Sequence, residues 1–213
     1  RCLSINPVDP KLELLSYKYF ILCIEKVNTL QYMKKIMTEL VFFGSLRSMK
    51  LLEAVINKKI DPKNIKDAII KNVKLFRVKN ENFPYLIDTK NSNDSINCII
   101  IKNLNALDID KIQFYESVEY KLDMIEIEIN NVIKKYNYFK YIKKNITGEK
   151  WIYEVWQKKF EESNCKAALL WMKLYCQYKK NPGKAEKFWP GMQRKVDDEM
   201  RKRRSRKKNP SLN

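Results

Sequence analysis

The chain has 213 residues, enough for one domain with a buried core plus an appendage or for two small domains, and we expect the first arrangement. Hydrophobic residues make up 45% of the chain and charged residues 32%, which excludes a largely disordered protein. The formal net charge is +18. Fifteen Lys or Arg residues against four acidic residues between positions 165 and 213 place +11 of that charge in the last quarter.

Cysteine and histidine usage excludes several kinds of site. Five cysteines without a Cys-x-x-Cys pair, in a chain with no histidine, predict reduced and mostly buried thiols and no zinc site. No other cofactor is expected. The longest apolar run near the N-terminus, Phe20 to Ile24, is far below the roughly 20 residues of a membrane-spanning helix, so we expect a soluble, intracellular protein. A mitochondrion or another organelle and, alternatively, the cytoplasm stay open as its compartment.

Hydrophobic periodicity along the chain predicts an α+β fold. Helical spacing over 11–35 predicts an amphipathic leading helix. Strands are then expected over 40–43, 68–78, 85–87, 96–101, 120–129 and 136–142, with helices over 49–58 and 109–115 between them. This order favours a small closed sheet, a mixed or antiparallel β-barrel, over a stack of βαβ units.

After Gly148 the pattern becomes helical to the end of the chain. Helical segments are expected from Trp151 to Phe160, over 167–178 and over 184–208, and Pro190 with Gly191 should interrupt the last near its start. We therefore expect three parts: an N-terminal helical extension (1–38), the α+β domain (39–147) and a basic helical C-terminal extension (148–213).

Several short motifs resemble, in order and spacing, those of the γ-glutamylcyclotransferase-like family, which includes avirulence-induced plant proteins. Val41 to Arg47 reads V-F-F-G-S-L-R, similar to the family's opening V-F-x-Y-G-[ST]-L-R. The later matches are Leu75-Phe76-Arg77-Val78, then Phe83-Pro84, then Ile99 to Leu107, then Ile112 to Tyr120, and finally a helix start with two tryptophans, Gly148 to Trp156. Three positions depart from the family pattern, which has Tyr at Phe43, Asp at Gln113 and Gly at Ser117.

The resemblance implies a reaction in which the α-amine of a γ-glutamyl compound attacks its own γ-carbonyl and releases 5-oxoproline. Glu116 stands at the family's catalytic carboxylate and is the candidate acid/base residue. The substrate-binding residues implied by the same resemblance are Phe43, Gly44, Ser45, Leu46 and Tyr120, with backbone N–H groups of the glycine loop around the substrate carboxylate. Without the resemblance, Glu116 would be interpreted as an exposed carboxylate at a helix end.

The basic C-terminal segment suggests a second kind of partner. Aromatic residues alternate with lysines before Arg201–Lys208, where seven of eight residues are basic. Lys and Arg neutralise phosphates, and aromatic rings stack on unpaired bases, so the segment indicates RNA or a ribonucleoprotein. The candidate nucleic-acid-binding residues are Arg194, Lys195, Arg201, Lys202, Arg203, Arg204, Arg206, Lys207 and Lys208. A solvated charged helix, a nuclear-localisation-like cluster and a tail for acidic protein surfaces are the alternatives.

Two hypotheses therefore stand side by side. The chain is either a γ-glutamylcyclotransferase-like enzyme acting on a γ-glutamyl small molecule, or a catalytically inactive member of that family that binds RNA in a ribonucleoprotein such as an organellar ribosome. An open cavity beside Glu116, Gly44 and Ser45 would favour the enzyme, and a cavity filled by the terminal helices would favour the scaffold.

Overall fold

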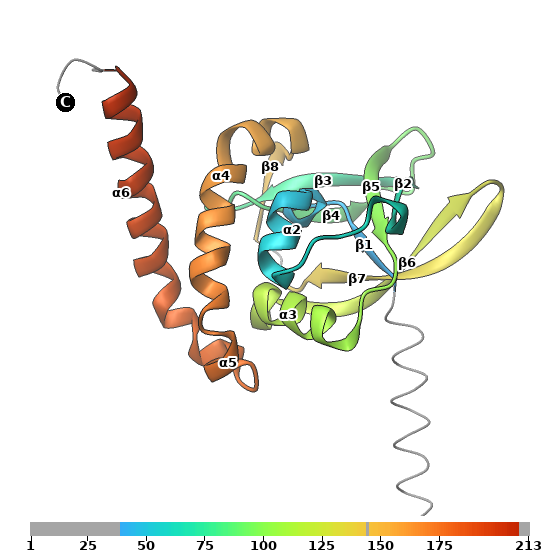
Figure 1. Ribbon diagram of the computed structural model, residues 1–213. Coiled ribbons are helices and arrows are strands. Elements are labelled where there is room, and N and C mark those ends of the chain that lie inside the picture. Colours follow the sequence, from blue (N-terminus) through green and yellow to red (C-terminus); the bar gives the residue numbers. More distant parts are fainter. Residues whose placement is uncertain (1–38, 144, 209–213) are drawn as a thin grey trace, which may run out of the picture. The chain divides into compact units, whose positions relative to one another are not determined.

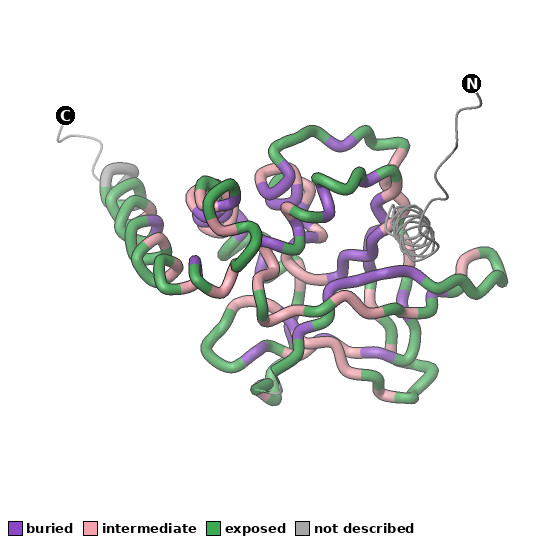
Figure 2. Tube along the Cα trace, turned by 90° about the horizontal axis from the view of Figure 1, so that it is seen from below, coloured by how far each residue is buried: buried purple, intermediate pink, exposed green. Residues whose placement is uncertain are grey.

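The computed structural model describes residues 39–143 and 145–208 (Figure 1). The leading helix expected over 11–35 lies outside the described residues. The expected α+β fold is confirmed: two β-sheets and several helices form one unit. Buried residues concentrate in the sheets and the helices packed on them, whereas the last helix is mostly exposed (Figure 2).

The larger sheet has five strands in the order β2-β5-β1-β7-β6. Its members are β1 (Leu40–Phe42), β2 (Ile65–Lys71), β5 (Ser95–Ile101), β6 (Tyr120–Ile129) and β7 (Val132–Tyr141). β1 is fully buried at the centre, antiparallel to β5 and parallel to β7. The β6–β7 hairpin turns at Asn130 and Asn131, both with positive φ, as a tight two-residue hairpin requires.

The smaller sheet has three antiparallel strands in the order β4-β3-β8. They are β3 (Val73–Val78), β4 (Pro84–Asp88) and β8 (Ile146–Lys150). The prediction of one strand over 68–78 is wrong, because Asn72 adopts a φ of 62° and turns the chain from β2 in one sheet into β3 in the other. Asparagine tolerates this left-handed conformation better than most residues.

The expected barrel is not closed among the described residues. The five-stranded sheet has β2 and β6 at its edges, and no hydrogen-bonded ladder joins them. The two edges nevertheless approach each other, since Lys71 on β2 donates to Glu128 on β6 at 2.7 Å. The sheet is therefore strongly curved, and its inner face and the smaller sheet provide walls for a cavity.

Helix α2 (Met49–Ile56) fixes the chain directly after β1. Ser48 caps its N-terminus by accepting from the N–H of Leu51, and Asn57 ends it in the left-handed conformation. The apolar side of α2 is buried, and α2 packs against α4 (Tyr153–Met172). Glu161 of α4 links the two helices, because its carboxylate accepts a 2.7 Å hydrogen bond from the Ser48 hydroxyl.

The C-terminal helices are α4, the single turn α5 (Tyr175–Tyr178) and α6 (Trp189–Lys208). α4 is continuous where two separate segments were expected. The α-helix predicted to begin at 184 instead begins at Trp189, after two short 3-10 turns. Pro190 lies in its first turn, a position where proline is tolerated because the missing N–H has no intrahelical acceptor. The sequence prediction placed this proline inside the helix, and the structure places it at the start.

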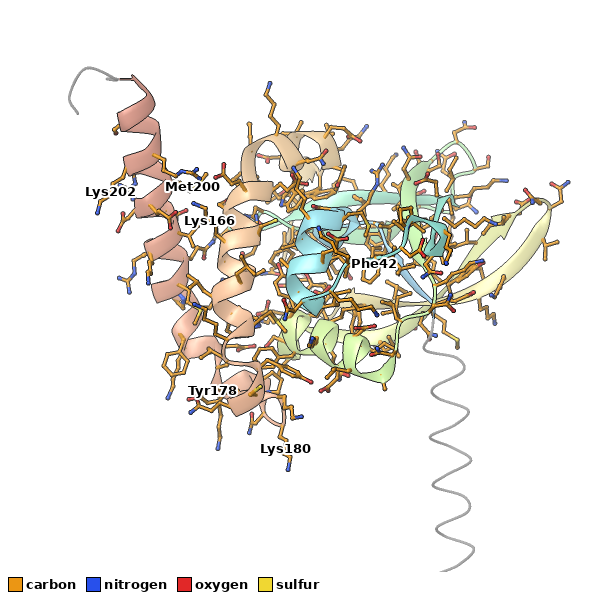
Figure 3. The ribbon with its side chains drawn as sticks, viewed as in Figure 1. Phe42, Lys166, Tyr178, Lys180, Met200 and Lys202 are labelled. Atoms are coloured by element: carbon orange, nitrogen blue, oxygen red, sulfur yellow. The ribbon has the colours of Figure 1, made fainter. Side chains whose placement is uncertain are left out.

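Helix α6 runs beside α4 (Figure 1). Val196 of α6 is buried, and ion pairs join Glu199 to Lys166 at 2.5 Å and Arg203 to Glu162 at 2.6 Å. Figure 3 shows Lys166 between the two helices and Lys202 on the side of α6 that faces away from α4. One side of α6 is thus held to the domain, and the other is free for solvent or a partner.

Candidate active site

The glycine turn after β1 forms one side of the site. The chain leaves β1 through Phe43 and Gly44 and enters a single 3-10 turn, Ser45–Arg47. A Cβ atom on Gly44 would lie 3.0 Å from Cγ of Pro84, closer than such contacts normally come, so any larger residue here would have to displace the Pro84 ring. Within the described chain the backbone N–H groups of Ser45 and Leu46 have no hydrogen-bond acceptor, which leaves them available to an anionic group.

Glu116 forms the opposite side of the site. It is the last residue of α3 (Ala106–Glu116), a helix that begins with a capping box between Asn105 and Asp108. The chain then turns at Ser117, whose φ of 58° and ψ of −158° lie in a region that glycine normally occupies. This turn ends the helix at the carboxylate and directs the following chain into β6.

Glu116 and the glycine turn line the same small cavity, which is open to solvent. The six residues predicted for catalysis and substrate binding, which come from three separate segments, all line it. These are Phe43, Gly44, Ser45, Leu46, Glu116 and Tyr120. The structure therefore brings the predicted site residues together, while their chemical roles stay a prediction.

The environment of Glu116 favours the protonated form of its carboxyl group. Burial raises the pKa of its carboxyl group from 4.5 to about 8. It forms no hydrogen bond or ion pair with any described residue, so its oxygens are free to meet a ligand. Burial also raises the pKa of Tyr120 well above its ordinary value, which keeps this neighbouring phenol neutral.

A second, wider cavity adjoins the first. It encloses about 990 Å³, with open solvent included, and shares Ser45, Glu116 and Tyr120 with the first cavity. Its other walls come from the segment before β4 and from the C-terminal helices, including Trp171, Glu186, Trp189, Pro190 and Gln193. The C-terminal helices therefore form part of the site and do not fill it.

Several lining residues were not predicted as site residues. Tyr138 on β7 lies beside Phe43, with ring centroids 5.7 Å apart, and lines the first cavity. A phenol is thus present next to the position where the family has tyrosine. Tyr138 carried no motif signal, because alternation along β7 does not reveal which face meets a cavity. The Phe83-Pro84 pair, in contrast, belongs to one of the motifs. Pro84 lines the first cavity and Phe83 lines the second.

The two other departures from the family pattern have different structural contexts. Gln113 is exposed on α3 and lines neither cavity, so its replacement of Asp leaves the walls of the site unchanged. Ser117 keeps the glycine-like backbone conformation, and its hydroxyl donates a 2.7 Å hydrogen bond to Glu186 of the C-terminal extension. Arg47, which follows the glycine turn, forms an ion pair with Glu154 at 3.7 Å and lies over the ring of Tyr153.

The predicted nucleic-acid-binding residues all lie on α6, and those whose side chains are described line neither cavity. Arg194, Lys195 and Lys202 are exposed and form no ion pair with a described residue. Arg201 and Arg203 are also exposed, and they form ion pairs with Asp198 and Glu162. Arg204, Arg206, Lys207 and Lys208 continue the same helix. The exposed side chains among them give α6 a basic side, while Trp189 and Gln193 of the same helix line the second cavity.

Among the described residues, no group of three or more acidic or cysteine side chains could hold a metal ion. The described helices include none that is long and apolar enough to cross a membrane.

The structure is thus a curved α+β domain in which a partly buried carboxylate faces a glycine turn across one cavity. Residues 40–165 match the family model described as gamma-glutamyl cyclotransferase, AIG2-like, and the chain belongs to this family. The match includes β8 and most of α4. The expected family membership is therefore confirmed.

The chain is also similar to solved structures of other proteins. Two solution structures of Arabidopsis thaliana proteins are similar, at 16% and 15% identity with TM-scores of 0.43 and 0.44. They cover 65% and 68% of this chain and 91% and 85% of their own. A crystal structure of an uncharacterised protein from Pyrococcus horikoshii has 16% identity and a TM-score of 0.36, covering 55% of this chain and 86% of its own. No curated protein matches the sequence.

Proposed function

We propose that the protein is a γ-glutamylcyclotransferase that releases 5-oxoproline from γ-glutamyl amines or peptides. The observation that carries this proposal is the position of Glu116, unpartnered and partly buried, across one cavity from the glycine turn.

The first step would seat the γ-glutamyl group between the two sides of the cavity. The free N–H groups of Ser45 and Leu46 would hold the substrate's α-carboxylate, and Tyr138 and Tyr120 would flank the glutamyl chain. This orientation presents the substrate's α-amine and γ-carbonyl to Glu116.

The chemical step needs one proton carrier. Ionised Glu116 accepts a proton from the substrate's α-ammonium, and the freed amine attacks the γ-carbonyl carbon. The bond to the leaving amine then breaks, and Glu116 returns the proton to that nitrogen. A carboxyl group with a pKa near 8 suits both transfers, because either protonation state is accessible near neutral pH.

The proposal is tested by the substitution Glu116→Gln, assayed by the formation of 5-oxoproline from a panel of γ-glutamyl amino acids and amines. Loss of the acid/base group should lower kcat/KM by roughly 10²- to 10⁴-fold. Glu128→Gln, which removes a carboxylate at the sheet edge that lines neither cavity, is the matched control and should retain activity. A wild-type protein that turns over no compound of the panel would refute the proposal.

The alternative predicted from the basic segment is a component of a ribonucleoprotein. The observation in its favour is the exposed basic side of α6, which includes Arg194, Lys195 and Lys202. None of the comparisons supports an RNA partner. Because Arg194, Lys195 and Lys202 line neither cavity, RNA binding and catalysis can be tested independently.

A further inference from the structure

We infer that the second cavity is the subsite for the leaving amine and that it selects leaving groups with an alkyl chain ending in a positive charge, such as a diamine. This inference rests on the proposed cyclotransferase activity, since it assigns a role to the space next to the same catalytic carboxylate. It also assigns a function to the C-terminal helices beyond residue 165, where the family match ends.

The location of the second cavity follows from the shared lining residues. Ser45, Glu116 and Tyr120 line both cavities, so the two spaces meet at the catalytic carboxylate. With the glutamyl group beside the glycine turn in the first cavity, the γ-amide lies near Glu116. Whatever is attached to its nitrogen must then extend into the second cavity.

The charge of the second cavity is opposite to that of the protein. The chain carries +18 overall, yet the charged residues that line this cavity are all acidic: Glu81, Glu116, Glu119 and Glu186. Glu119 is paired with Lys143, but Glu81 has no ion pair with a described residue. Partial desolvation and repulsion from Glu119 raise the pKa of Glu81, with Lys143 acting in the opposite direction, and a further cation bound here would favour the charged form of Glu81.

The remaining walls suit an alkylammonium chain. Trp171, Trp189, Phe83 and Tyr120 provide apolar area for methylene groups and ring faces that attract a cation. The rings are held rigidly, because Trp171 stacks on Phe114 at 5.3 Å and meets Trp189 edge-on at 5.5 Å. Trp171 also donates to the carbonyl of Phe114, two residues before Glu116. The extension is therefore fixed next to the catalytic residue.

The reaction remains balanced without any co-reactant. The α-amine forms the new bond to the γ-carbon, the bond from that carbon to the leaving nitrogen breaks, and Glu116 carries one proton from the first nitrogen to the second. The products are 5-oxoproline and the free diamine.

The test compares three γ-glutamyl amides of equal chain length that differ only at the end of the leaving group. The leaving amines are 1,4-diaminobutane, pentylamine and 5-aminopentanoate, which end in an ammonium, a methyl and a carboxylate group. We expect kcat/KM to fall in that order, with at least a 10-fold advantage of the diamine over pentylamine. Equal values for the three substrates would overturn the inference and leave the proposed activity intact.

Two variants identify the carboxylates responsible. Glu186→Gln removes a charge but keeps an oxygen that can accept the Ser117 hydrogen bond, and Glu81→Gln removes the charge at the rim. Each should reduce the ratio of diamine to pentylamine turnover about 3- to 10-fold. Glu162→Gln, an exposed carboxylate of α4 that lines neither cavity, should leave the ratio unchanged. A ratio unaffected in both cavity variants would contradict the inference.

A binding measurement separates this inference from the proposed function. Calorimetric titration of the Glu116→Gln protein with 1,4-diaminobutane and with pentylamine requires no turnover. Tighter binding of the diamine, weakened by Glu186→Gln, would support the subsite even if the panel substrates were not cleaved. Absence of both cleavage and diamine binding would overturn both proposals, and cleavage without preferential diamine binding would overturn the subsite alone.

Discussion

At the scale of single residues, the protonation of Glu116 determines how activity and stability depend on pH. The cyclisation needs one proton shared between Glu116 and the substrate amine, and the pKa of Glu116 is about 8. We therefore expect kcat/KM to rise with pH through about 8, as Glu116 ionises, and to fall only at higher pH, where the substrate's α-ammonium group loses its proton. An ordinary glutamate would give a plateau from about pH 5, so a flat profile between pH 5.5 and 7.5 would contradict the assignment.

The same shift has a consequence for folding. The folded protein binds the Glu116 proton more tightly than the unfolded chain, in which the pKa is near 4.5. Its contribution to stability is therefore complete below pH 4.5 and is lost as pH rises to about 8. The Glu116→Gln variant should lack this part of the decline when denaturant unfolding is compared with wild type across that range.

Ser117 stores backbone strain directly after the catalytic residue. A non-glycine residue in its conformation costs on the order of 1–3 kcal/mol, and the hydrogen bond to Glu186 returns about 1 kcal/mol. Ser117→Gly should stabilise the fold by roughly 1 kcal/mol in urea unfolding, because the strain energy that it relieves is larger than the energy of the hydrogen bond that it removes. Ser117→Ala loses the bond but keeps the strain, so it should be less stable than wild type. Equal stability of the two variants would contradict this account.

At the scale of helices and strands, Glu161 is the polar link between α2 and α4. Its carboxylate is nearly buried and accepts hydrogen bonds from Ser48, Lys50 and Gln157. Glu161→Ala leaves these donors unpaired and should cost about 1–3 kcal/mol in unfolding free energy. The neighbouring Glu162→Ala removes only exposed ion pairs and should cost less than about 1 kcal/mol. Similar costs for the two variants would show that the link is unimportant.

The strands and helices also show what the sequence can and cannot predict. Strands with clear alternation, such as β6 over 120–129, were predicted with their observed bounds. β8 was missed because it is short and mostly exposed, so it has no apolar pattern. Residues 68–78 were predicted as one strand because the segments on both sides of Asn72 are rich in residues that favour strands. Only the left-handed backbone conformation of Asn72 separates the two strands.

The residues of the candidate site that belong to a family motif could be predicted from the sequence. Those that reach the site only through packing of the C-terminal helices could not. Gly44, Glu116 and Tyr120 were found through the family resemblance, which links residues far apart in the chain. Trp189 and Glu186 come from a helical extension whose composition suggested only a basic surface. Their position depends on the contact of Trp171 with Phe114, and no periodicity in either helix predicts that contact.

At the scale of the whole molecule, the charge distribution predicts how the protein meets nucleic acid. Binding of a single-stranded RNA by the basic side of α6 would be electrostatic, so its affinity should fall steeply with salt. Reversing three exposed charges, with Arg194→Glu, Lys195→Glu and Lys202→Glu, should weaken binding and reduce the salt dependence by about two units in the logarithmic slope, as measured by fluorescence anisotropy. Unchanged binding by this variant would exclude α6 as the interface.

The hydrogen bond between Ser117 and Glu186 joins the strained turn of the family domain to the C-terminal extension. A chain without that extension would keep the strain of a serine here and lose the partner that offsets it. Serine at this position and the C-terminal helices should accordingly have been gained together in evolution, and relatives that lack the helices should have glycine. The identity of this one residue would then indicate, from sequence alone, which relatives carry the second subsite.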